Sequence, residues 1–411
     1  MVFPAEPVEN RFSTSLMKIL QVISFAEIVV LHTEVFKRLE LKFYQVFRSS
    51  ETTFWKGLKS RCCFKTMPKE LLAIGPREPV LLEYEERPLK KGEIRIRSIF
   101  SAEKHGTTLL LYRGEAPFLN KYYDQERMLF LNRADEKSYF PFPLGNMTVG
   151  IVEEVSPGVT RFKVGDRVYG YLPIRETHTV YEQNVMPAPE SVSDEELVCV
   201  DPAVVALMAV REGHVRLGDK VAIFGMGAIG LLTLQMCKIS GSLCVIAVEP
   251  VEKKRSLAEK FGADYVIDPT SEDAGTKIRE LTNGKGVDVS LEISGSYQAL
   301  HQAIRATRYG GNVIPVSWYH GEAKGLYLGE EFHFNRITLL SGARVESEPY
   351  REHPLWNRER VYATVIELFI RKKISVQGII DPIVKFSQVV EAYRKIDEQP
   401  WECVKLGVTY S

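Results

Sequence analysis

The chain has 411 residues, 45% of them hydrophobic and 26% charged, with as many basic as acidic side chains. This composition is typical of a globular protein with two or three domains and excludes a disordered or fibrous chain. A formal charge of zero gives no general attraction to nucleic acid or to an anionic membrane surface, and the longest apolar stretch, 197–210, is too short to cross a bilayer, so neither is expected as a partner.

Residues 1–66 differ from the rest of the chain. They contain an adjacent cysteine pair and an apolar stretch interrupted by charges, but no clear signal peptide. A strand-like pattern begins only at Met67, so we expect 1–66 to be a poorly ordered extension or a misassigned start. The other four cysteines are scattered singly, which predicts neither a disulfide framework nor a zinc ribbon and favours a reducing, cytoplasmic setting.

Two different patterns follow Met67. Up to about residue 199, short β-type runs alternate with turn residues, which predicts an all-β, barrel-like unit. From Asp201 on, strand and helix signals alternate, which predicts βαβ units around a parallel sheet. The expected strands are 221–224, 243–248, 265–267, 287–293 and 312–316. Beyond residue 344 we expect helices around 361–372 and 387–396, and closing β-type residues.

A glycine turn joins the first of these strands to an apolar helix. Gly225, Gly227 and Gly230 occupy the three glycine positions of a dinucleotide-binding turn that reads Gly225-Met226-Gly227-Ala228-Ile229-Gly230. The first glycine permits the tight turn, the second lets the backbone approach a pyrophosphate, and the third lets helix and strand pack closely. The alternative is a tight turn without a ligand.

Glu249 follows Gly230 by 19 residues and ends the second strand, where a carboxylate accepts hydrogen bonds from the ribose hydroxyls and repels a 2′-phosphate. This predicts NAD(H) in preference to NADP(H). The alternative is that the basic residues at 253–255 hold a 2′-phosphate instead. Lys254 could also reach the ribose beside Glu249.

The stretch 218–230, with Gly-Ala-Asp at 262–264 and Gly-Gly-Asn-Val at 310–313, resembles the cofactor domain of medium-chain dehydrogenases/reductases. A second block, from Gly150 to Val168, is similar to the signature of their GroES-like catalytic domain. The resemblance covers Met67 to the C-terminus and is nearest to the sorbitol-dehydrogenase-like branch. It implies an α/β fold with a GroES-like β-barrel domain at 67–200 and 344–411, and a Rossmann doubly wound parallel sheet at 201–343.

The family's zinc ligands are altered. His105 replaces the first ligand, in His-Gly-Thr-Thr, and Gly-Asn-Met at 145–147 replaces a Gly-His-Glu block. Asp201-Pro202 stands at the third position. Only His105 and Asp201 could bind metal, whereas a catalytic zinc needs three protein ligands. The four-cysteine lobe of the structural zinc is missing as well, so we expect no zinc and no other metal.

Without a metal, proton transfer needs a side chain, and His105 is the candidate, with Thr107 as relay. The alternative is that His105 only fills the space of the missing ligand. We interpret Asp201 as the N-cap or first-turn residue of a helix, and Glu103 and Lys104 as solvated. We place His178 on a barrel strand. An aromatic-rich insert at 111–144 is either a lid over the substrate or a segment packed on the barrel.

Together these features predict a zinc-independent, NAD(H)-preferring oxidoreductase. It would move hydride between the nicotinamide and a small alcohol or carbonyl substrate, with a polyol or sugar suggested by the resemblance alone. The alternatives are a quinone-reductase-like enoyl reductase, a zinc enzyme with rearranged ligands, and an NAD(H)-binding sensor without catalysis. The resemblance also implies a homodimer or homotetramer.

Overall fold

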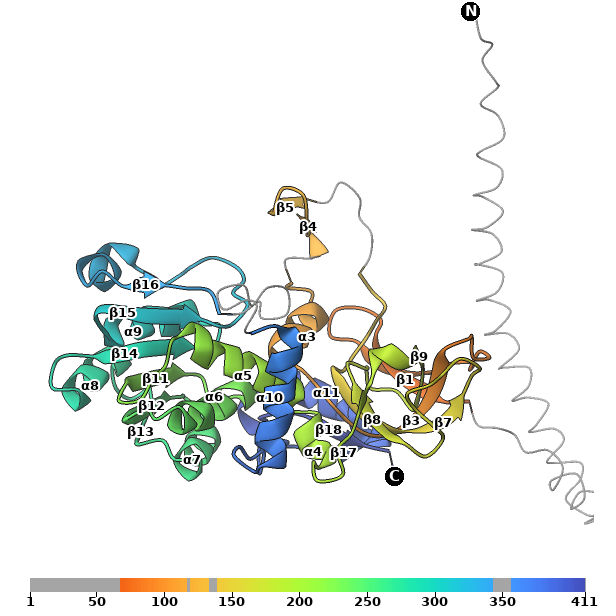
Figure 1. Cartoon of the computed structure of the whole chain (residues 1–411). Helices are drawn as coiled ribbons and strands as arrows, with labels where there is room; N and C mark the ends of the chain where they lie inside the picture. The colour runs from red at the N-terminus through yellow and green to blue at the C-terminus, as the bar shows by residue number, and fades with distance from the viewer. Residues whose placement is uncertain (1–66, 117–118, 133–138, 343–355, 411) are drawn as a thin grey trace, which may run out of the picture. The chain divides into compact units, whose positions relative to one another are not determined.

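A computed structural model describes residues 67–116, 119–132, 139–342 and 356–410. The extension at 1–66 lies outside these residues, and so does the predicted domain boundary at 343/344. Within the described residues the chain forms antiparallel β structure first, then a parallel sheet with helices, and then returns to the antiparallel part (Figure 1). None of the described helices is long and apolar enough to cross a membrane.

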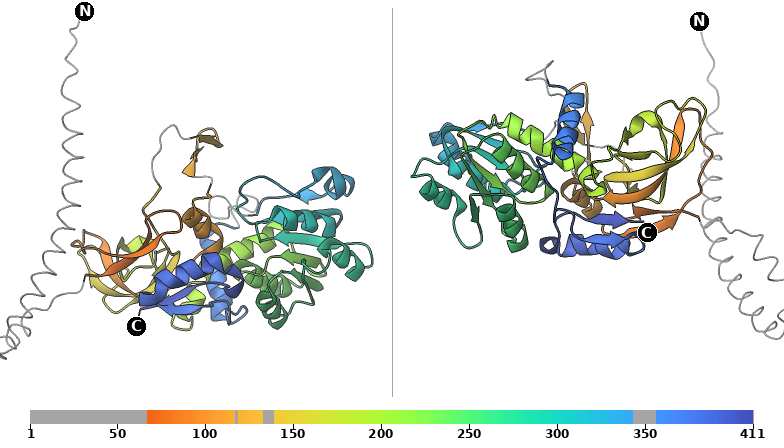
Figure 2. Two further views of the ribbon diagram at one scale, coloured as in Figure 1. Left: turned by 180° about the vertical axis from the view of Figure 1, so that it is seen from behind. Right: turned by 60° about the horizontal axis from the view of Figure 1, so that its bottom comes forward.

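The antiparallel part is built around β3 (Glu93–Ala102), which pairs with β7 (Met147–Val155), β9 (Thr177–Tyr181) and β18 (Gly407–Thr409). The same sheet continues through β8, β10 and β17, and a small sheet of β1, β2 and β6 accompanies it. Their bounds are Lys69–Ala73 for β1, Pro79–Glu83 for β2, Phe142–Pro143 for β6, Arg167–Gly170 for β8, Met186–Pro187 for β10 and Ile383–Lys385 for β17. In Figure 2 the blue C-terminal strands lie beside the orange region of β3, so the end of the chain completes this sheet.

The parallel part is a six-stranded sheet in the order β13-β12-β11-β14-β15-β16. Counted along the chain this is the 3-2-1-4-5-6 order of the Rossmann fold, whose strand order reverses between β11 and β14. The strands are β11 (Lys220–Phe224), β12 (Cys244–Val248), β13 (Tyr265–Ile267), β14 (Val287–Glu292), β15 (Thr307–Pro315) and β16 (Thr338–Leu339). The predicted fold class is therefore confirmed; the exact domain boundaries stay a prediction.

The parallel strands are nearly continuous apolar runs because helices cover both faces of the sheet. On β11, Val221 and Ile223 pack into one core and Ala222 and Phe224 into another. The first core also holds side chains of α5, α6 and α10, and the second those of α8 and α9. The helix bounds are α5 Val200–Glu212, α6 Ala228–Ile239, α8 Ala274–Leu281, α9 Tyr297–Ala306 and α10 Arg358–Ile370.

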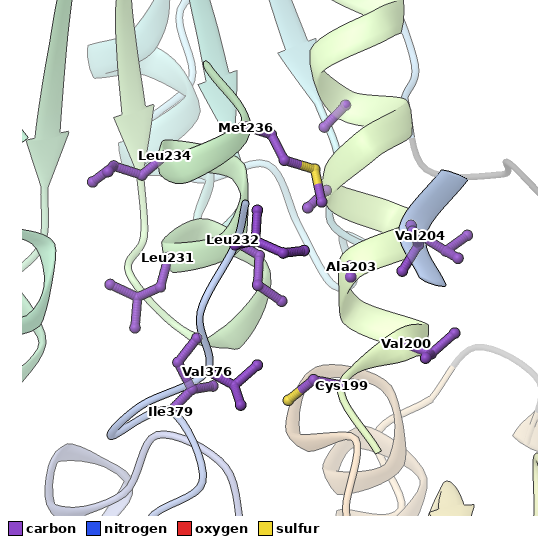
Figure 3. Close-up of a cluster of buried hydrophobic side chains, with 14 of the residues drawn as sticks. Cys199, Val200, Ala203, Val204, Leu231, Leu232, Leu234, Met236, Val376 and Ile379 are labelled. Atoms are coloured by element: carbon purple, nitrogen blue, oxygen red, sulfur yellow. The ribbon is translucent and has the colours of Figure 1, made fainter. Parts of the chain in front are cut away.

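Helices α5 and α6 lie side by side in the first core. Figure 3 shows Ala203 on α5 and Leu232 and Met236 on α6 within one cluster of buried side chains, which Val376 and Ile379 join from the segment after α10. Gln235 ties the same segment to α6, because its amide group exchanges two hydrogen bonds with the backbone of Ser375, at 2.8 and 3.0 Å. The helices that open the nucleotide half are therefore packed against the C-terminal part of the chain.

Further helices and short helical turns lie between the strands and in the C-terminal part. The other elements are α3 (His105–Arg113), α4 (Asp194–Leu197), α7 (Glu252–Lys260) and α11 (Val389–Glu398), with short turns η3 (Glu182–Asn184), η4 (Leu328–Phe332), η6 (Phe386–Gln388) and η7 (Pro400–Glu402). The C-terminal helices α10 and α11 lie within a few residues of the expected positions. Helices α8 and α9 are short and were not predicted individually.

The aromatic-rich insert divides into two parts. Its hairpin, β4 (Lys121–Asp124) and β5 (Leu129–Asn132), pairs with no other described strand and exposes Met128 and Phe130. Phe142, by contrast, is buried against β1 in a core of the antiparallel part. Packing on the barrel is thus observed for the end of the insert, and a lid role for the hairpin stays a prediction.

Candidate functional site

The glycine turn lies at the carboxyl end of β11, where the strand order reverses. Gly225 has φ +94°, a left-handed conformation that favours glycine, and an added Cβ would lie 2.9 Å from the backbone nitrogen of Ser294. A Cβ on Gly230 would lie 1.9 Å from the carbonyl oxygen of Gly225, whereas one on Gly227 would meet nothing within 4 Å. Packing within the protein therefore requires glycine at positions 225 and 230, whereas the space next to Gly227 is open.

Helix α6 begins at Ala228 with Gly227 as its N-cap, and no side chain caps it. Backbone N–H groups at such a helix start attract a phosphate, because they lack partners within the helix and carry the positive end of its dipole. The open space at Gly227 and the uncapped start of α6 coincide. This is the arrangement that a pyrophosphate needs for close approach to the backbone.

Glu249 follows β12 directly and is 5% exposed. Its carboxylate accepts the backbone N–H of Met226 at 2.6 Å and that of Val251 at 3.0 Å. The side chain therefore ties the glycine turn to the end of the neighbouring strand. A carboxylate has about four acceptor positions, so Glu249 retains capacity for the ribose hydroxyls predicted for it.

Two of the three cations that follow Glu249 already have partners. The guanidinium of Arg255 donates to the carbonyl oxygens of Glu249 and Pro250, at 2.9 and 2.7 Å, and pairs with Asp268. Lys253 pairs with Asp381 and donates to the carbonyl oxygen of Glu402. These contacts weaken the alternative in which the basic cluster holds a 2′-phosphate.

Lys254 is the third cation. It is half-buried on α7, and its ammonium group makes no hydrogen bond or ion pair with the part of the chain that the structure describes. The contact of Lys254 with the cofactor ribose stays a prediction. Its ammonium group is available for such a contact.

A second buried carboxylate lies across the turn and was missed by the sequence analysis. Glu292 ends β14 and is fully buried; it accepts the N–H groups of Ser294 and Gly295, at 2.8 and 3.2 Å, and the hydroxyls of Ser294 and Tyr319. Burial raises the pKa of Glu292 and that of Tyr319. The sequence does show a glutamate at the end of a strand, in Glu-Ile-Ser-Gly at 292–295. Such a pattern alone does not distinguish an ordinary turn from a functional site.

The residues in place of the family's metal ligands form a polar network. Lys104 follows β3, and its ammonium group lies 3.1 Å from Oδ1 of Asp201, while the side-chain amide of Asn146 donates to Oδ2 at 2.9 Å. Asp201 is 2% exposed and lies inside α5, whose N-cap is Cys199. Asp201 thus lies in the first turn of α5, one of the two positions expected for it, while Cys199 and not Asp201 is the N-cap. Both of its carboxylate oxygens are engaged by side chains from other segments.

Glu103 and Lys104 are not simply solvated, contrary to expectation. Glu103 is fully buried and accepts the N–H of Lys104 at 2.6 Å, while Lys405, 3% exposed, donates to the carbonyl oxygen of Glu103. Burial raises the pKa of Glu103 and lowers that of Lys405. The residues next to Glu103 are polar, so the sequence gives no sign that it is buried. The burial results from the C-terminal segment, which pairs with β3.

His105 begins α3, and its Nε2 accepts the backbone N–H of Leu406 at 2.9 Å. Desolvation, reinforced by the positive charges of Lys405, Lys254 and Arg113, lowers the pKa of His105 to about 3. The ring is thus neutral near pH 7, with its proton on Nδ1 by this hydrogen bond. Thr107 is half-buried in the first turn of α3. A proton-transfer role for either residue stays a prediction, although the geometry favours a positioning role for His105.

The comparisons with known proteins agree with this architecture. The family model described as an alcohol dehydrogenase GroES-like domain matches residues 121–190, and the zinc-binding dehydrogenase model matches 228–357. D-guloside 3-dehydrogenase of Escherichia coli K12 is 37% identical over 350 residues, which cover 83% of this chain and all of that protein. The chain belongs to the medium-chain dehydrogenases/reductases.

Solved structures share the fold of this medium-chain dehydrogenase. That of 2R,3R-butanediol dehydrogenase from Bacillus subtilis matches with a TM-score of 0.67 and 25% identity, over 84% of this chain and all of the other. A zinc-binding dehydrogenase from Sinorhizobium meliloti, bound to NADP, matches with a TM-score of 0.67 and 19% identity. The match covers 84% of this chain and all of the other chain. The chain is thus an enzyme, an oxidoreductase of the alcohol and polyol dehydrogenase type.

Zinc does not fit the residues that this medium-chain dehydrogenase presents at the catalytic metal position. Both oxygens of Asp201 and Nε2 of His105 accept hydrogen bonds, Asn146 offers only a weak amide ligand, and the ammonium of Lys104 lies 3.1 Å from Asp201. A zinc ion needs three protein ligands and would be repelled by the ammonium group. No mechanistic step is therefore assigned to zinc.

A separate group with metal-ligand spacing occurs on α9 and η4, where ligand atoms of His301, Glu330 and Glu331 lie within 4.8 Å of one another. Among the described residues, Glu331 also pairs with Arg305 at 3.4 Å, and His301 lies 3.7 Å from Glu330. The neighbouring guanidinium opposes cation binding there.

Proposed function

We propose that this enzyme is an NAD(H)-preferring, zinc-independent dehydrogenase acting on a hydroxyl of a sugar or polyol, or on the corresponding ketone. The substrate proposal is supported by the similarity to D-guloside 3-dehydrogenase of Escherichia coli K12, which this chain matches over the whole length of that protein. The name of that relative gives a D-guloside as its substrate. In the oxidative direction the carbinol C–H bond breaks, its electron pair and hydrogen pass as hydride to oxidised nicotinamide, and the hydroxyl proton is released to solvent.

The observation that carries the cofactor preference is the buried Glu249 carboxylate, held against the glycine turn by the N–H of Met226. A 2′-phosphate at the ribose would meet this charge in a desolvated position, while the nearby Arg255 and Lys253 are engaged elsewhere. The cofactor supplies the hydride chemistry when bound. The protein residues that would hold it are the glycine turn 225–230, for the phosphates, and Glu249 and Lys254, for the ribose.

The test is a pair of binding titrations, with NADH and with NADPH, on the full chain. We expect NADH to bind more tightly by about 10-fold or more, since one ionic repulsion of about 1.4 kcal/mol suffices for that ratio. Glu249→Gln should remove most of the preference, whereas Glu259→Gln, which removes an exposed charge on the following helix α7, should leave it unchanged. Equal or better NADPH affinity of the unaltered protein would refute the preference.

The substrate proposal is tested by incubating the full chain with sugars, polyols, simple alcohols and enones, and following NADH absorbance. Turnover with sugars or polyols that persists after exhaustive chelation supports it. Turnover confined to enones would favour a quinone-reductase-like enoyl reductase. Tight NADH binding with no turnover would favour an NAD(H)-binding sensor without catalysis.

We further propose a homo-oligomer in a reducing, cytoplasmic setting. The edge strand β16 and the exposed Tyr309, Tyr327 and Phe334 offer an apolar surface that a second copy could cover, and the described cysteines are free thiols. Light scattering coupled to size exclusion measures the mass in solution; a monomer at all concentrations contradicts the proposal.

A further inference from the structure

An ammonium group pairs with Asp201, at one of the positions where the family resemblance places a zinc ligand. Lys104 leaves the end of β3 and places Nζ 3.1 Å from Asp201, on α5. The two residues are 97 positions apart in the chain, and Asn146, which precedes β7, completes the contact from a third segment. Three segments of the fold thus converge on one positive charge and its carboxylate partner.

The network is built to hold that charge in place. Asp201 is almost fully buried, and a buried carboxylate is costly unless it is paired and hydrogen-bonded. Its two oxygens are satisfied separately, one by the ammonium of Lys104 and the other by the amide of Asn146. Lys104 therefore has a fixed partner that sets the position of Nζ.

The ammonium itself is only partly enclosed. The Lys104 side chain is 28% exposed, against 2% for Asp201. An ammonium group has three N–H donors, and one of them is used by Asp201 within the described residues. The remaining donors are available to an oxygen atom that enters from the exposed side.

Two further basic groups of this region, Lys405 and His105, are already engaged. Lys405 is 3% exposed and donates to the carbonyl oxygen of Glu103, and Nε2 of His105 accepts a backbone N–H. Lys104, by contrast, has an ammonium group that is both held by Asp201 and partly exposed.

We infer that Lys104 takes over the electrostatic task of the missing metal, by donating a hydrogen bond to the reacting oxygen of the substrate. The inference rests on the proposed dehydrogenase function. In ketone reduction the carbonyl carbon accepts hydride from the reduced nicotinamide, the π-electron pair moves to oxygen, and the alkoxide then takes a proton from water. The ammonium stabilises the negative charge on that oxygen and stays protonated throughout; Asp201 and Asn146 are positioning residues.

The test compares Lys104→Met with Lys104→Arg in the full chain. Loss of one preorganised donor at a developing oxyanion lowers kcat by about 10²- to 10³-fold, and we expect a loss of this order for Lys104→Met with NADH affinity unchanged. Lys104→Arg should retain part of the activity. Methylammonium should partly rescue Lys104→Ala, which a purely structural role for the lysine would not allow.

Controls address folding and charge. Lys324→Met removes one partner of an exposed ion pair with Glu322 and should leave activity unchanged. Because Lys104→Met leaves Asp201 unpaired, the double variant Lys104→Met/Asp201→Asn is measured as well; it removes both charges and should fold, bind NADH and remain inactive.

The outcomes separate the two proposals. A protein that binds NADH but turns over no substrate refutes the proposed function, and this inference with it. Turnover by the unaltered protein together with near-normal activity in Lys104→Met refutes the inference alone. Elemental analysis that finds about one zinc per chain, with activity lost on chelation, also overturns it.

Discussion

Alanine substitutions in the glycine turn should separate cofactor binding from folding. Gly227 has φ −72°, which alanine adopts easily, and an added Cβ would meet nothing within 4 Å. Gly227→Ala should therefore leave the free protein as stable as before, or about 0.4–1 kcal/mol more stable through reduced chain entropy in the unfolded state. The same methyl group would occupy the space through which a pyrophosphate approaches the turn. Forcing a methylene-sized group into a fitted contact costs about 1–3 kcal/mol, which corresponds to about 5- to 150-fold weaker NADH binding.

Gly230→Ala should act in the opposite way. Its Cβ would lie 1.9 Å from the carbonyl oxygen of Gly225, so α6 must shift by about 1.5 Å to restore an ordinary contact. Because Leu231 and Leu232 of that helix are fully buried, the shift disturbs the core, and we expect a loss of about 1–3 kcal/mol in the free energy of unfolding.

Thermal unfolding without cofactor and NADH titration by fluorescence measure the two effects. Gly329→Ala, at an exposed site where a Cβ also meets nothing within 4 Å, is the control and should change neither. A Gly227→Ala protein that binds NADH as tightly as the original would refute the assignment of the phosphates to this turn. An unaltered melting temperature in Gly230→Ala would refute the packing argument.

Two further predictions concern buried titratable groups. Burial, with a contribution from Arg175, lowers the pKa of His178 from 6.5 to about 3, so its neutral form stabilises the fold fully above pH 6.5 and this contribution is lost as the pH falls toward 3. At pH 5 the loss is about 2 kcal/mol by linkage, and replacing His178 with Gln should flatten the pH dependence of urea unfolding between pH 7 and 5; an unchanged slope contradicts the assignment. Burial also raises the pKa of the Cys199 thiol to about 12 and raises that of Cys237, so neither should react with a thiol reagent at pH 8 before the protein unfolds, and mapping of labelled peptides would expose an error.

The nucleotide half could be predicted from the sequence because its constraints are local. The turn at 225–230 needs glycine for reasons of backbone geometry within a few residues, and the strands β11, β12 and β14 are apolar runs that helices must cover on both faces. Glu249 was identified in the same way, from its distance along the chain. Its hydrogen bond to the N–H of Met226 was not predicted, since it depends on the side-chain conformation.

The polar network at the other site could not be predicted in this way. Lys104 and Glu103 follow one another in a polar stretch, and nothing local distinguishes a solvated pair from one that is enclosed by residues of α5 and of the C-terminal segment. The free energy of a charged side chain depends on the partners and solvent around it, and those come from segments far apart in the chain.

The sequence by itself determined the parallel sheet, the glycine turn and the identity of the residues at the family's zinc-ligand positions, because backbone geometry, apolar periodicity and residue identity depend on neighbouring positions. Only the tertiary structure decided which partners surround these residues. The pairing of Gly407 with Ala102 brings the end of the chain to β3, and the same fold brings Asp201 to Lys104. An ion pair between residues that are distant in the chain exists only once the chain has folded, since its geometry is set by the packing of the segments that carry them.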